Sequence, residues 1–560
     1  MCATLPPDGT LLLAAAASCT MFRQRTFGEG WALSEIVPPS EAAQKATRSI
    51  AGAAGIIGAG NIVSRVLGLV RELVIADYFG ASPFLSAFRV ASQVPTMIFD
   101  LLIGGMLSSA LIPVFSDYAE NRKKELWELA SVLFSLAAVI LTALVILLEL
   151  GAPVVAWLLG GGFEPEVLAM TTRLIRAVLP AVLVFGISGI AIGLLYSLQR
   201  FAYPAFGAAI YNLGLIISAV FLAVWLDVYA LAVGILLGAI FQFGLLAPGL
   251  RDGHFRFSLN LKHPGLRRIL KLYLPIVLGL VVSQIGIAID RNLASRTGGE
   301  SIAWMQYATN LVQFPLGLVA AAISLASLPS LARSDYAKDD AGYERTLGIS
   351  LRMVLVLLVP ATIGLFVLAQ PVVALIFEHG AFGPQDTVQV ANALRFYLFG
   401  LTFAGIDQLL IFAFYARKNT LTPALVGVAA VGIYLIVALA LIRPLGMIGL
   451  VIANSCQLAG HAIIMLFLLR KSLGHSRLGG TVLKSLAAAG GMGLAVYWSA
   501  AQAARFAGNE SFTGWLLQVG AGGALGILVY AVLISRLKVD EWALFSGAVR
   551  RRLRLTRHNR

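Results

Sequence analysis

The sequence predicts an all-α polytopic membrane protein of about fourteen transmembrane helices, arranged as two six-helix lobes followed by two further helices. Three observations predict this class. The 560-residue chain is 59% hydrophobic and only 12% charged, whereas soluble domains are about a quarter charged. Apolar stretches long enough to cross a hydrocarbon core of about 30 Å recur along the chain. Part of the first half also recurs in the second half. This composition excludes a soluble enzyme, a disordered chain and a disulfide-rich scaffold.

Each predicted helix follows from length and composition. Lipid offers no hydrogen-bond partner to unpaired backbone groups, so apolar spans of this length must be helical. The predicted spans are residues 51–78, 87–114, 127–150, 172–197, 205–226, 229–249, 266–294, 301–330, 347–369, 388–415, 422–442, 445–469, 481–504 and 513–535.

The spans divide the chain into five predicted regions. Residues 1–49 hold one short apolar run without a preceding basic cluster, so we expect a disordered extension rather than a signal peptide. An N-terminal lobe at 50–250 contains six spans, and a C-terminal lobe at 251–470 contains six more. Two further spans occupy 471–540, and 541–560 form a basic tail on the inner side.

The lysines and arginines predict the orientation of the chain. If the N-terminus lies inside, most of the 42 basic residues fall on inner segments. The outer loops then hold only Arg291, Arg296, Arg443 and Arg505. This positive-inside bias predicts that both termini are inside. It also explains the net charge of +14 by contacts with anionic lipid, so no nucleic-acid partner is expected.

Motifs for catalysis and cofactor binding are not visible. The sequence has no phosphate-binding loop of the type GxxxxGK[ST] and no HExxH. Its cysteines, Cys2, Cys19 and Cys456, lack metal-ligand spacing. We therefore expect neither an enzyme nor an ATP-driven pump, with no catalytic residue, no cofactor and no dedicated metal site.

Arginines within the predicted spans indicate a polar cavity. Six basic residues remain after those counted with the inner and outer segments, and they lie within the spans: Arg65, Arg71, Arg89, Arg173, Arg176 and Arg395. An arginine near the bilayer centre costs at least about 2.5–3.5 kcal/mol, so it normally faces a polar space. Arg173 and Arg176 lie near a helix end, where they can reach the headgroups. The deeper Arg65, Arg71 and Arg89 all belong to the first two spans.

Helical spacing places further polar residues beside these arginines, because residues three or four apart share a helix face. Single polar residues are explained by hydrogen bonds between helices, but four polar stripes favour a water-filled cavity. We expect Arg65 and Glu72 to neutralise each other in part. The stripes are Asn61, Arg65, Gly68 and Glu72; Arg89, Gln93, Thr96 and Asp100; Ser283, Gly286 and Asp290, with Gln284 beside them; and Gln306, Thr309, Asn310 and Gln313.

An internal repeat relates the two lobes. Ser64-Arg65-Val66 recurs as Ser283-Gln284-Ile285, Pro95 as Pro315, and Ser116-Asp117-Tyr118 as Ser334-Asp335-Tyr336, all at a near-constant offset. Six spans, an even number, separate the copies. The repeat is therefore parallel, with a pseudo-axis along the membrane normal, as in some transporters. Such an axis places a substrate cavity between the lobes.

Six short motifs occur in order within residues 50–470: SRVLGLVRE at 64–72, ALIPVFSDY at 110–118, FPLG at 314–317, LPSL at 328–331, GAF at 380–382 and FYARKNTLTP at 414–423. They resemble motifs of the MurJ/MviN family of lipid II flippases, which belongs to the MOP superfamily with the MATE exporters.

The resemblance implies a multi-pass protein of the bacterial cytoplasmic membrane that acts in peptidoglycan biosynthesis, and hence in cell-wall formation and cell shape. It implies a cationic cavity between the lobes, a groove at the last two spans for a polyprenyl tail, and alternating access. The implied partners are an undecaprenyl-pyrophosphate-linked disaccharide-pentapeptide, membrane lipids and proteins of cell-wall synthesis.

The sequence departs from the family pattern around the cavity. The second span reads Pro95-Thr-Met-Ile-Phe-Asp100, and the eighth reads Tyr307-Ala-Thr-Asn310, where the family usually has further arginines. Ser86 stands where the family usually has an aspartate, and Arg89 is additional. Some relatives bind sodium through an aspartate of the seventh span, which makes Asp290 a candidate. However, 422–442 contain no Asp, Glu or Asn to complete such a site.

We therefore predict a transporter that flips lipid II, the lipid-linked peptidoglycan precursor. The alternatives are a flippase for another polyprenyl-linked oligosaccharide and, more remotely, a MATE-like cation-coupled exporter. A structural scaffold would not need arginines inside the membrane. The predicted substrate-binding residues are Arg65, Arg71, Arg89, Glu72, Asn310 and Gln313. The rationale is that guanidinium groups bind diphosphate oxygens bidentately.

Overall fold

The computed structural model describes residues 41–104, 110–473, 478–508, 510–542 and 547. The described residues form helices and turns, with no β-strand among them. The predicted regions at 1–49 and 541–560 fall largely outside this part of the chain. Within the first of them, α1 already begins at Glu41.

In the described part of the first half, before residue 247, the chain forms α-helices and π-helical turns. They are α1 (Glu41–Phe79), α2 (Pro83–Phe99), η1 (Asp100–Gly104), α3 (Ile112–Asn121), α4 (Lys123–Leu150), α5 (Ala152–Gly160), α6 (Pro165–Val178), α7 (Pro180–Ser197), α8 (Ala202–Ala205), α9 (Gly207–Leu226) and α10 (Tyr229–Leu246).

The second half repeats this pattern and adds two long helices. After the short η3 (Ala247–Leu250) come α11 (Pro264–Ser295), α12 (Ser301–Pro315), η4 (Leu316–Ala320), α13 (Ala321–Tyr336), α14 (Asp340–Val367), α15 (Ala369–Phe377), α16 (Pro384–Ala416), α17 (Leu421–Leu445), α18 (Met447–Leu468), η5 (Arg470–Leu473), α19 (Leu478–Ala507) and α20 (Phe512–Arg536).

The predicted membrane-protein class is confirmed. Among the described residues, ten helices are long and apolar enough to cross a membrane. Three further predicted spans, 51–78, 266–294 and 481–504, coincide with α1, α11 and α19. The predicted span 87–114 overlaps α2, η1 and the start of α3, and its residues 105–109 lie outside the described residues. Large apolar side chains such as Leu150, Trp225 and Ile527 are exposed on the outside of the bundle, where a bilayer would cover them.

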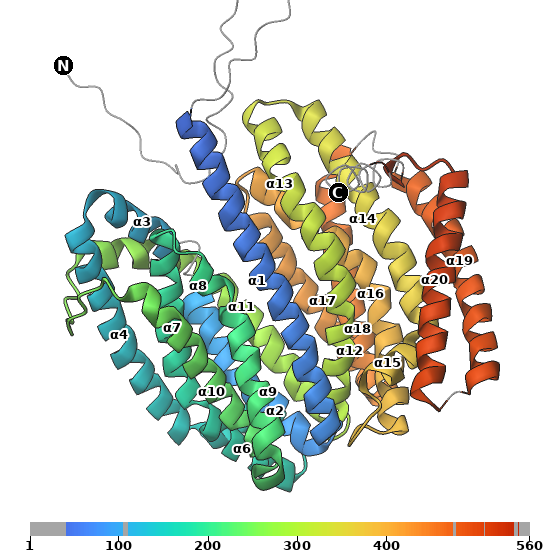
Figure 1. Ribbon diagram of the computed structural model, residues 1–560, viewed down its shortest axis with the longest axis horizontal. Helices are drawn as coiled ribbons and strands as arrows, with labels where there is room; N and C mark the ends of the chain where they lie inside the picture. Colours follow the sequence, from blue (N-terminus) through green and yellow to red (C-terminus); the bar gives the residue numbers. More distant parts are fainter. Residues whose placement is uncertain (1–40, 105–109, 474–477, 509, 543–546, 548–560) are drawn as a thin grey trace, which may run out of the picture.

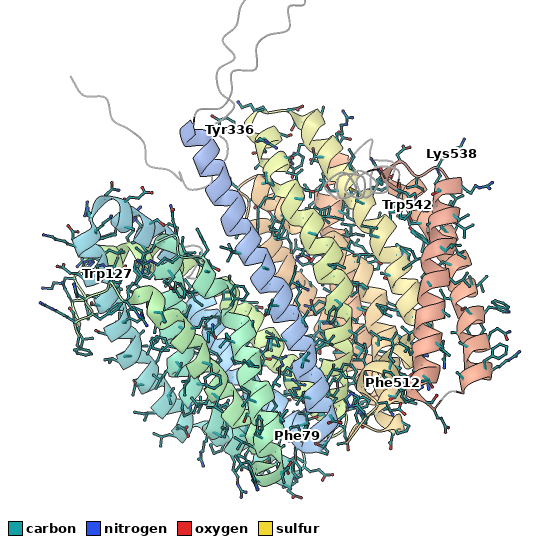
Figure 2. The ribbon with its side chains drawn as sticks, in the orientation of Figure 1. Phe79, Trp127, Tyr336, Phe512, Lys538 and Trp542 are labelled. Atoms are coloured by element: carbon teal, nitrogen blue, oxygen red, sulfur yellow. The ribbon has the colours of Figure 1, made fainter. Side chains whose placement is uncertain are left out.

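The two halves lie side by side, with α1 running between them (Figure 1). In the first half α9 packs on α10 and on α1, and in the second half α18 packs on α16 and α17. The final pair, α19 and α20, packs on α14 and α15 at the far edge of the second half. The ends of the helices alternate between two ends of the molecule: Phe79 and Phe512 lie at one, Tyr336 and Lys538 at the other (Figure 2).

Two proline-associated π-helical segments occur at equivalent places in the halves. Pro95 lies in α2, shortly before η1, and Pro315 ends α12, directly before η4. Proline removes one helical hydrogen bond. The π-helical turns nearby have i→i+5 hydrogen bonds in place of the regular α-helical ones. The sequence repeat that pairs these prolines therefore corresponds to a shared interruption of two helices that meet near the centre of the molecule.

Candidate functional site

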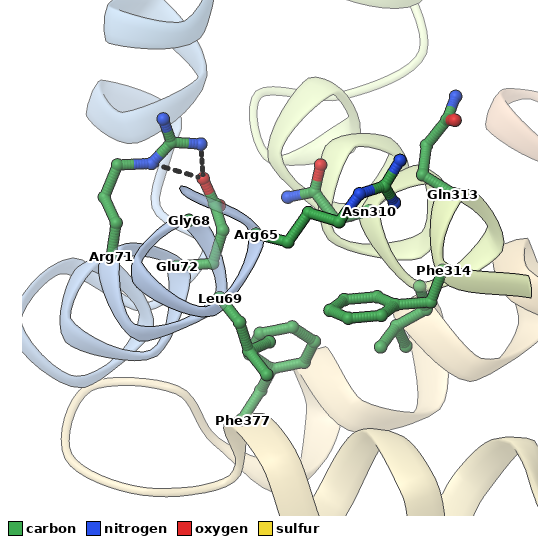
Figure 3. A pocket seen from close by; sticks show the side chains of 10 residues that line it. Arg65, Gly68, Leu69, Arg71, Glu72, Asn310, Gln313, Phe314 and Phe377 are labelled. Atoms are coloured by element: carbon green, nitrogen blue, oxygen red, sulfur yellow. Dashed lines mark hydrogen bonds and ion pairs between the residues drawn. The ribbon is translucent and has the colours of Figure 1, made fainter. Parts of the chain in front are cut away.

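A pocket of about 190 Å³ lies between the two halves, lined by α1 on one side and by α12 and α15 on the other. Five of the six predicted binding residues line it. Figure 3 shows Arg65 extending from α1 towards Asn310 of α12. The lining residues are Arg65, Gly68, Leu69, Arg71, Glu72, Asn310, Leu311, Gln313, Phe314 and Phe377.

Glu72 is the buried centre of a three-residue charge cluster. Only 3% of its surface is exposed. Arg71 donates from Nη2 to Oε1 at 2.6 Å and from Nε at 3.1 Å. Arg89 donates from Nη2 to Oε2 at 2.5 Å and from Nη1 to Oε1 at 3.3 Å. One carboxylate is thus shared by two guanidinium groups, which leaves the cluster with one net positive charge.

Arg71 is held in place from a helix that the sequence did not single out. Its Nη1 donates to Oδ1 of Asn212 in α9 at 2.9 Å. Asn212 in turn donates from Nδ2 to the backbone oxygen of Ser64 at 3.2 Å. A buried asparagine in an otherwise apolar span was the available signal. Asn212 ties α9 to α1 and orients the Arg71 guanidinium towards Glu72.

Arg89 lies behind the pocket rather than in its lining. It is largely buried, its guanidinium carbon lies 5.7 Å from the ring centroid of Tyr307, and its Nε has no hydrogen-bond partner. The sequence predicts Arg89 to be a substrate-binding residue. In the structure it binds Glu72 across the α1–α2 interface instead. The ring face of Tyr307 adds a cation–π contact across the two halves.

Arg65 is the free arginine of the pocket. It forms no hydrogen bond or ion pair with any described residue, so the expected pairing of Arg65 with Glu72 is wrong. The two residues are seven apart on α1, about 10 Å along the helix axis, and Glu72 is already occupied. The Arg65 guanidinium lies against Gly317 of η4: a Cβ added there would meet Nη1 at 2.4 Å. Because Gly317 has no side chain, Arg65 can cross from one half to the other.

A second polar chain enters the pocket from α11. Arg291 donates from Nη2 to Gln306 at 3.1 Å, and Gln306 donates from Nε2 to Asn310 at 3.1 Å. The Nδ2 atom of Asn310 is buried without a partner. Arg291, which the orientation argument counted with the outer loops although the predicted span reaches residue 294, lies within α11, which ends at Ser295. Gln313 lines the same side of the pocket.

The carboxylate of Asp290, the candidate sodium ligand, accepts a hydrogen bond from a tyrosine hydroxyl. Tyr434 of α17 donates to its Oδ1 at 2.5 Å. In the described part of the chain, no group of three or more His, Cys, Asp or Glu residues comes together as a metal site.

The two halves are joined at the end where α1 passes into α2. There Tyr307 donates to the backbone oxygen of Gly80 at 2.8 Å, and the Ala381 amide donates to the backbone oxygen of Asp77 at 2.7 Å. The Asp77 carboxylate also contacts His379 at 3.2 Å. These contacts close the pocket at the end that the predicted orientation assigns to the outside.

Comparison with known proteins identifies the family. The sequence model of the family described as "Lipid II flippase MurJ" matches residues 75–514. The chain belongs to the lipid II flippase MurJ family. It is 29% identical over 426 residues to the lipid II flippase MurJ of Burkholderia cenocepacia, covering 73% of this chain and 82% of that protein. It is 31% identical over 428 residues to the probable lipid II flippase MurJ of Haemophilus influenzae, covering 72% and 83%.

Solved structures agree with this membership. The chain matches an inward closed conformation of lipid II flippase MurJ with a TM-score of 0.73 and 26% identity, over 86% of this chain and 98% of that one. An inward-facing MATE transporter of the MOP superfamily matches with a TM-score of 0.62 and 16% identity, over 74% and 96%. The second match shows a shared fold. The resemblance inferred from the sequence motifs is confirmed, as is the class of multi-pass membrane transporter.

Proposed function

We propose that this chain flips lipid II from the inner to the outer face of the bacterial cytoplasmic membrane by alternating access. Its MurJ relatives are named for lipid II. Flipping requires the protein to bind a lipid-linked headgroup, move it across the membrane and release it, and no covalent bond is formed or broken. The pocket between the two halves, which holds the charged groups of Arg65, Arg71 and Glu72, and the apolar outer surface provide the two environments that such a substrate needs.

The observation that carries this proposal is the unpaired guanidinium of Arg65 in a pocket with net positive charge. A diphosphate bears about two negative charges, and arginine binds phosphate oxygens through two parallel hydrogen bonds. Arg65, Arg71 and Arg89 face a single carboxylate, Glu72, in this region. This balance favours an anionic headgroup over the cationic cargo of an exporter.

Glu72 acts in the proposal as a resident counter-ion. The diphosphate competes with it for Arg71, which is about a quarter exposed. When Arg71 turns to the substrate, Arg89 still holds Glu72 through the 2.5 Å contact to Oε2. The buried carboxylate therefore never loses all its partners. Asn310, with a free Nδ2, and Gln313 contact the sugar or peptide part of the headgroup.

Access alternates by separation of the two halves at the α1–α2 end. With both termini in the cytoplasm, the contacts of Gly80 and Asp77 form the outer closure, and the substrate enters from the inner side. The π-helical segments η1 and η4 lie where helices of the two halves can bend. The polyprenyl tail stays in lipid against α19 and α20, whose outer faces carry exposed apolar residues such as Leu494 and Ile527.

Complementation tests this function. A bacterium depleted of its own lipid II flippase stops growing and loses cell shape, and expression of this chain is expected to restore both. Normal membrane abundance without restored growth would contradict the proposed substrate. Restoration by wild type but not by Arg65→Ala would connect the function to the pocket.

Gly317 is expected to control the position of Arg65. In Gly317→Ala the new Cβ would meet the Arg65 guanidinium, at 2.4 Å from Nη1, so the side chain must move. We expect a several-fold slower flipping rate at normal abundance, measured with labelled lipid II in proteoliposomes. Gly364→Ala is the matched control, because its Cβ meets only the end of the Met492 side chain at 3.7 Å. Equal rates for the two variants would refute this role of Gly317.

Tyr307→Phe is expected to loosen the outer closure. It keeps the ring beside Arg89 but removes the hydroxyl that donates to Gly80, a bond worth about 0.5–1.5 kcal/mol. We expect up to about tenfold faster labelling of Asn310→Cys by an impermeant thiol reagent added from outside, in a chain whose native cysteines are serine.

The control for this measurement is Tyr497→Phe, because Tyr497 is exposed on α19 and far along the chain from the closure. Unchanged labelling in Tyr307→Phe would show that this hydrogen bond does not keep the pocket closed.

A further inference from the structure

A buried carboxylate–imidazole pair lies in the second half, away from the pocket. Asp407 of α16 and His461 of α18 are both less than a tenth exposed. The Nδ1 atom of His461 makes a short contact with Oδ1 of Asp407. Its Nε2 faces the backbone oxygen of Pro423 in the first turn of α17 at 3.3 Å. One imidazole therefore joins three neighbouring helices of the lobe (Figure 1).

Both ring nitrogens of His461 face oxygen atoms, and this fixes the number of protons at the site. A carbonyl oxygen only accepts, so Nε2 must carry a proton to bond Pro423. The contact between Nδ1 and Asp407 then holds one more proton, on the imidazole or on the carboxyl. In either case the pair is neutral and both contacts are satisfied.

Loss of that proton breaks this arrangement. The pair then carries one net negative charge among apolar helices, and one ring nitrogen can no longer donate. If Nδ1 keeps its proton for Asp407, the Nε2 lone pair faces the Pro423 oxygen, and two acceptors repel. Burying an uncompensated charge is costly. The deprotonated pair therefore favours a different packing of α16, α17 and α18, or entry of water.

No second charge in the described helices around the site substitutes for the proton. Asp407 is the one charged side chain among them that contacts His461. Gly427 of α17 also borders the ring, with no side chain of its own. Other titratable or charged groups on the packed helices bond elsewhere or lie at helix ends. They include Asp290 with Tyr434, Arg291 with Gln306, Arg395 with Asn392, Tyr343 with the Ala413 oxygen, Asp386 with Trp304, Tyr397 beside Asp290 and Thr309, and Arg443 at the end of α17. Cys456 of α18 is a free thiol five residues before His461.

The pair is connected to the pocket through α16. Gly405, two residues before Asp407, lies close to Ala320, the last residue of η4: a Cβ added at Gly405 would be 3.5 Å from the Ala320 Cβ. The Arg65 guanidinium lies against Gly317 of the same π-helical segment. A shift of α16 at Asp407 therefore reaches the segment against which the free arginine lies.

We propose that Asp407 and His461 form a proton-binding site, and that the coupling ion of transport is a proton. This rests on the proposed function. Pro423 lies at the start of α17, at the end of the lobe opposite to the outer closure, so the inward-facing state releases the proton to the cytoplasm. A proton moving inward then drives the lipid headgroup outward.

Two substitutions imitate the two states of the site. In Asp407→Asn the amide donates to Nδ1 while Nε2 donates to Pro423, so the pair stays neutral like the protonated form. In His461→Gln the glutamine amide can donate to the Asp407 carboxylate, which favours its charged form, but the imidazole proton is gone, as in the deprotonated pair. His254→Gln, in an exposed loop, is the control. His379 also has oxygen acceptors at both nitrogens, Asp77 and the Ile376 carbonyl, so every variant is also made in a His379→Gln background.

The first measurement does not depend on lipid II. Labelling of Asn310→Cys, with the native cysteines replaced, is followed against pH in lipid nanodiscs without substrate. Because the thiolate is the reactive species and its fraction rises with pH, each rate is divided by that of an exposed reference cysteine, Tyr497→Cys in the same background. The wild type and the His254→Gln control should then change their relative labelling rate several-fold with pH. Asp407→Asn should keep the low-pH rate and His461→Gln the high-pH rate at every pH. A pH response that survives in both variants would overturn the site.

The second measurement is flipping in proteoliposomes under an imposed pH gradient. The wild type should flip labelled lipid II faster when the outside is acidic, and both variants should lose this acceleration. Flipping that is indifferent to the gradient in the wild type would overturn the proton as coupling ion but leave the proposed function intact. Conversely, pH-dependent labelling without flipping under any gradient would support the site and contradict the function.

Discussion

Arg65→Ala is expected to lower the flipping rate by at least about tenfold while leaving the protein folded. Arg65 has no partner among the described residues, so its removal strands no other charge. What is lost is the group free to bind the diphosphate, and a charge-assisted hydrogen bond contributes about 1.5–3 kcal/mol. The measurement is the initial rate of lipid II flipping in proteoliposomes, normalised to the amount of folded protein.

Arg65→Lys is the informative companion variant. It keeps the charge but lacks the planar fork for two oxygens, so we expect partial activity between wild type and alanine. The same rate for alanine and wild type would exclude Arg65 from substrate binding. Full activity of the lysine variant would show that only charge matters at this position.

Glu72→Gln is expected to destabilise the protein strongly. Glu72 is the shared partner of Arg71 and Arg89, and Arg89 is itself largely buried. Without the carboxylate, two guanidinium groups face each other with no counter-ion. Breaking a buried ion pair by removal of one partner typically costs about 3–5 kcal/mol. We expect a clear fall in the apparent unfolding temperature in detergent and lower membrane abundance.

A second substitution should reverse part of this effect. Removing Arg89 as well, in Glu72→Gln with Arg89→Gln, leaves Arg71 alone, and Arg71 keeps its bond to Asn212. We expect the double variant to be more stable than the sum of the two single effects. Strictly additive losses would mean that Arg89 and Glu72 are not energetically coupled, contrary to the two hydrogen bonds between them.

The fold was predictable because lipid imposes simple rules on the sequence. Length and hydropathy placed the spans, and the pairing of Pro95 with Pro315 revealed two halves that share a π-helical interruption. The helix boundaries differ where proline divides a span: 172–197 forms α6 and α7, which meet at Pro180. Hydropathy cannot detect this break, because both parts are compatible with membrane burial.

The residues of the pocket were predictable from helical spacing, but their partners were not. Arg65 and Glu72 share a face of α1, as spacing required, and both line the pocket. Spacing says nothing about groups from other helices, and these decide the pairing. Arg89 from α2 and the neighbouring Arg71 occupy Glu72, which leaves Arg65 free.

Three further residues escaped prediction for separate reasons. Asn212 is a single polar residue in an apolar span, a pattern that usually marks an ordinary interhelical bond. Gly317 contributes by having no side chain. Arg291 lies near the end of the predicted span 266–294 and was counted with the outer-loop charges, because the sequence does not show that Gln306 of α12 accepts its hydrogen bond.

The central claim is that a lipid-linked diphosphate is moved through the pocket at Arg65. The most direct measurement places the purified protein in liposomes with fluorescent lipid II and follows quenching from the outside over time. Wild type should make both leaflets accessible, and Arg65→Ala, at equal folded amounts, should leave the inner leaflet protected. Equal accessibility with wild type, Arg65→Ala and protein-free liposomes would contradict the account.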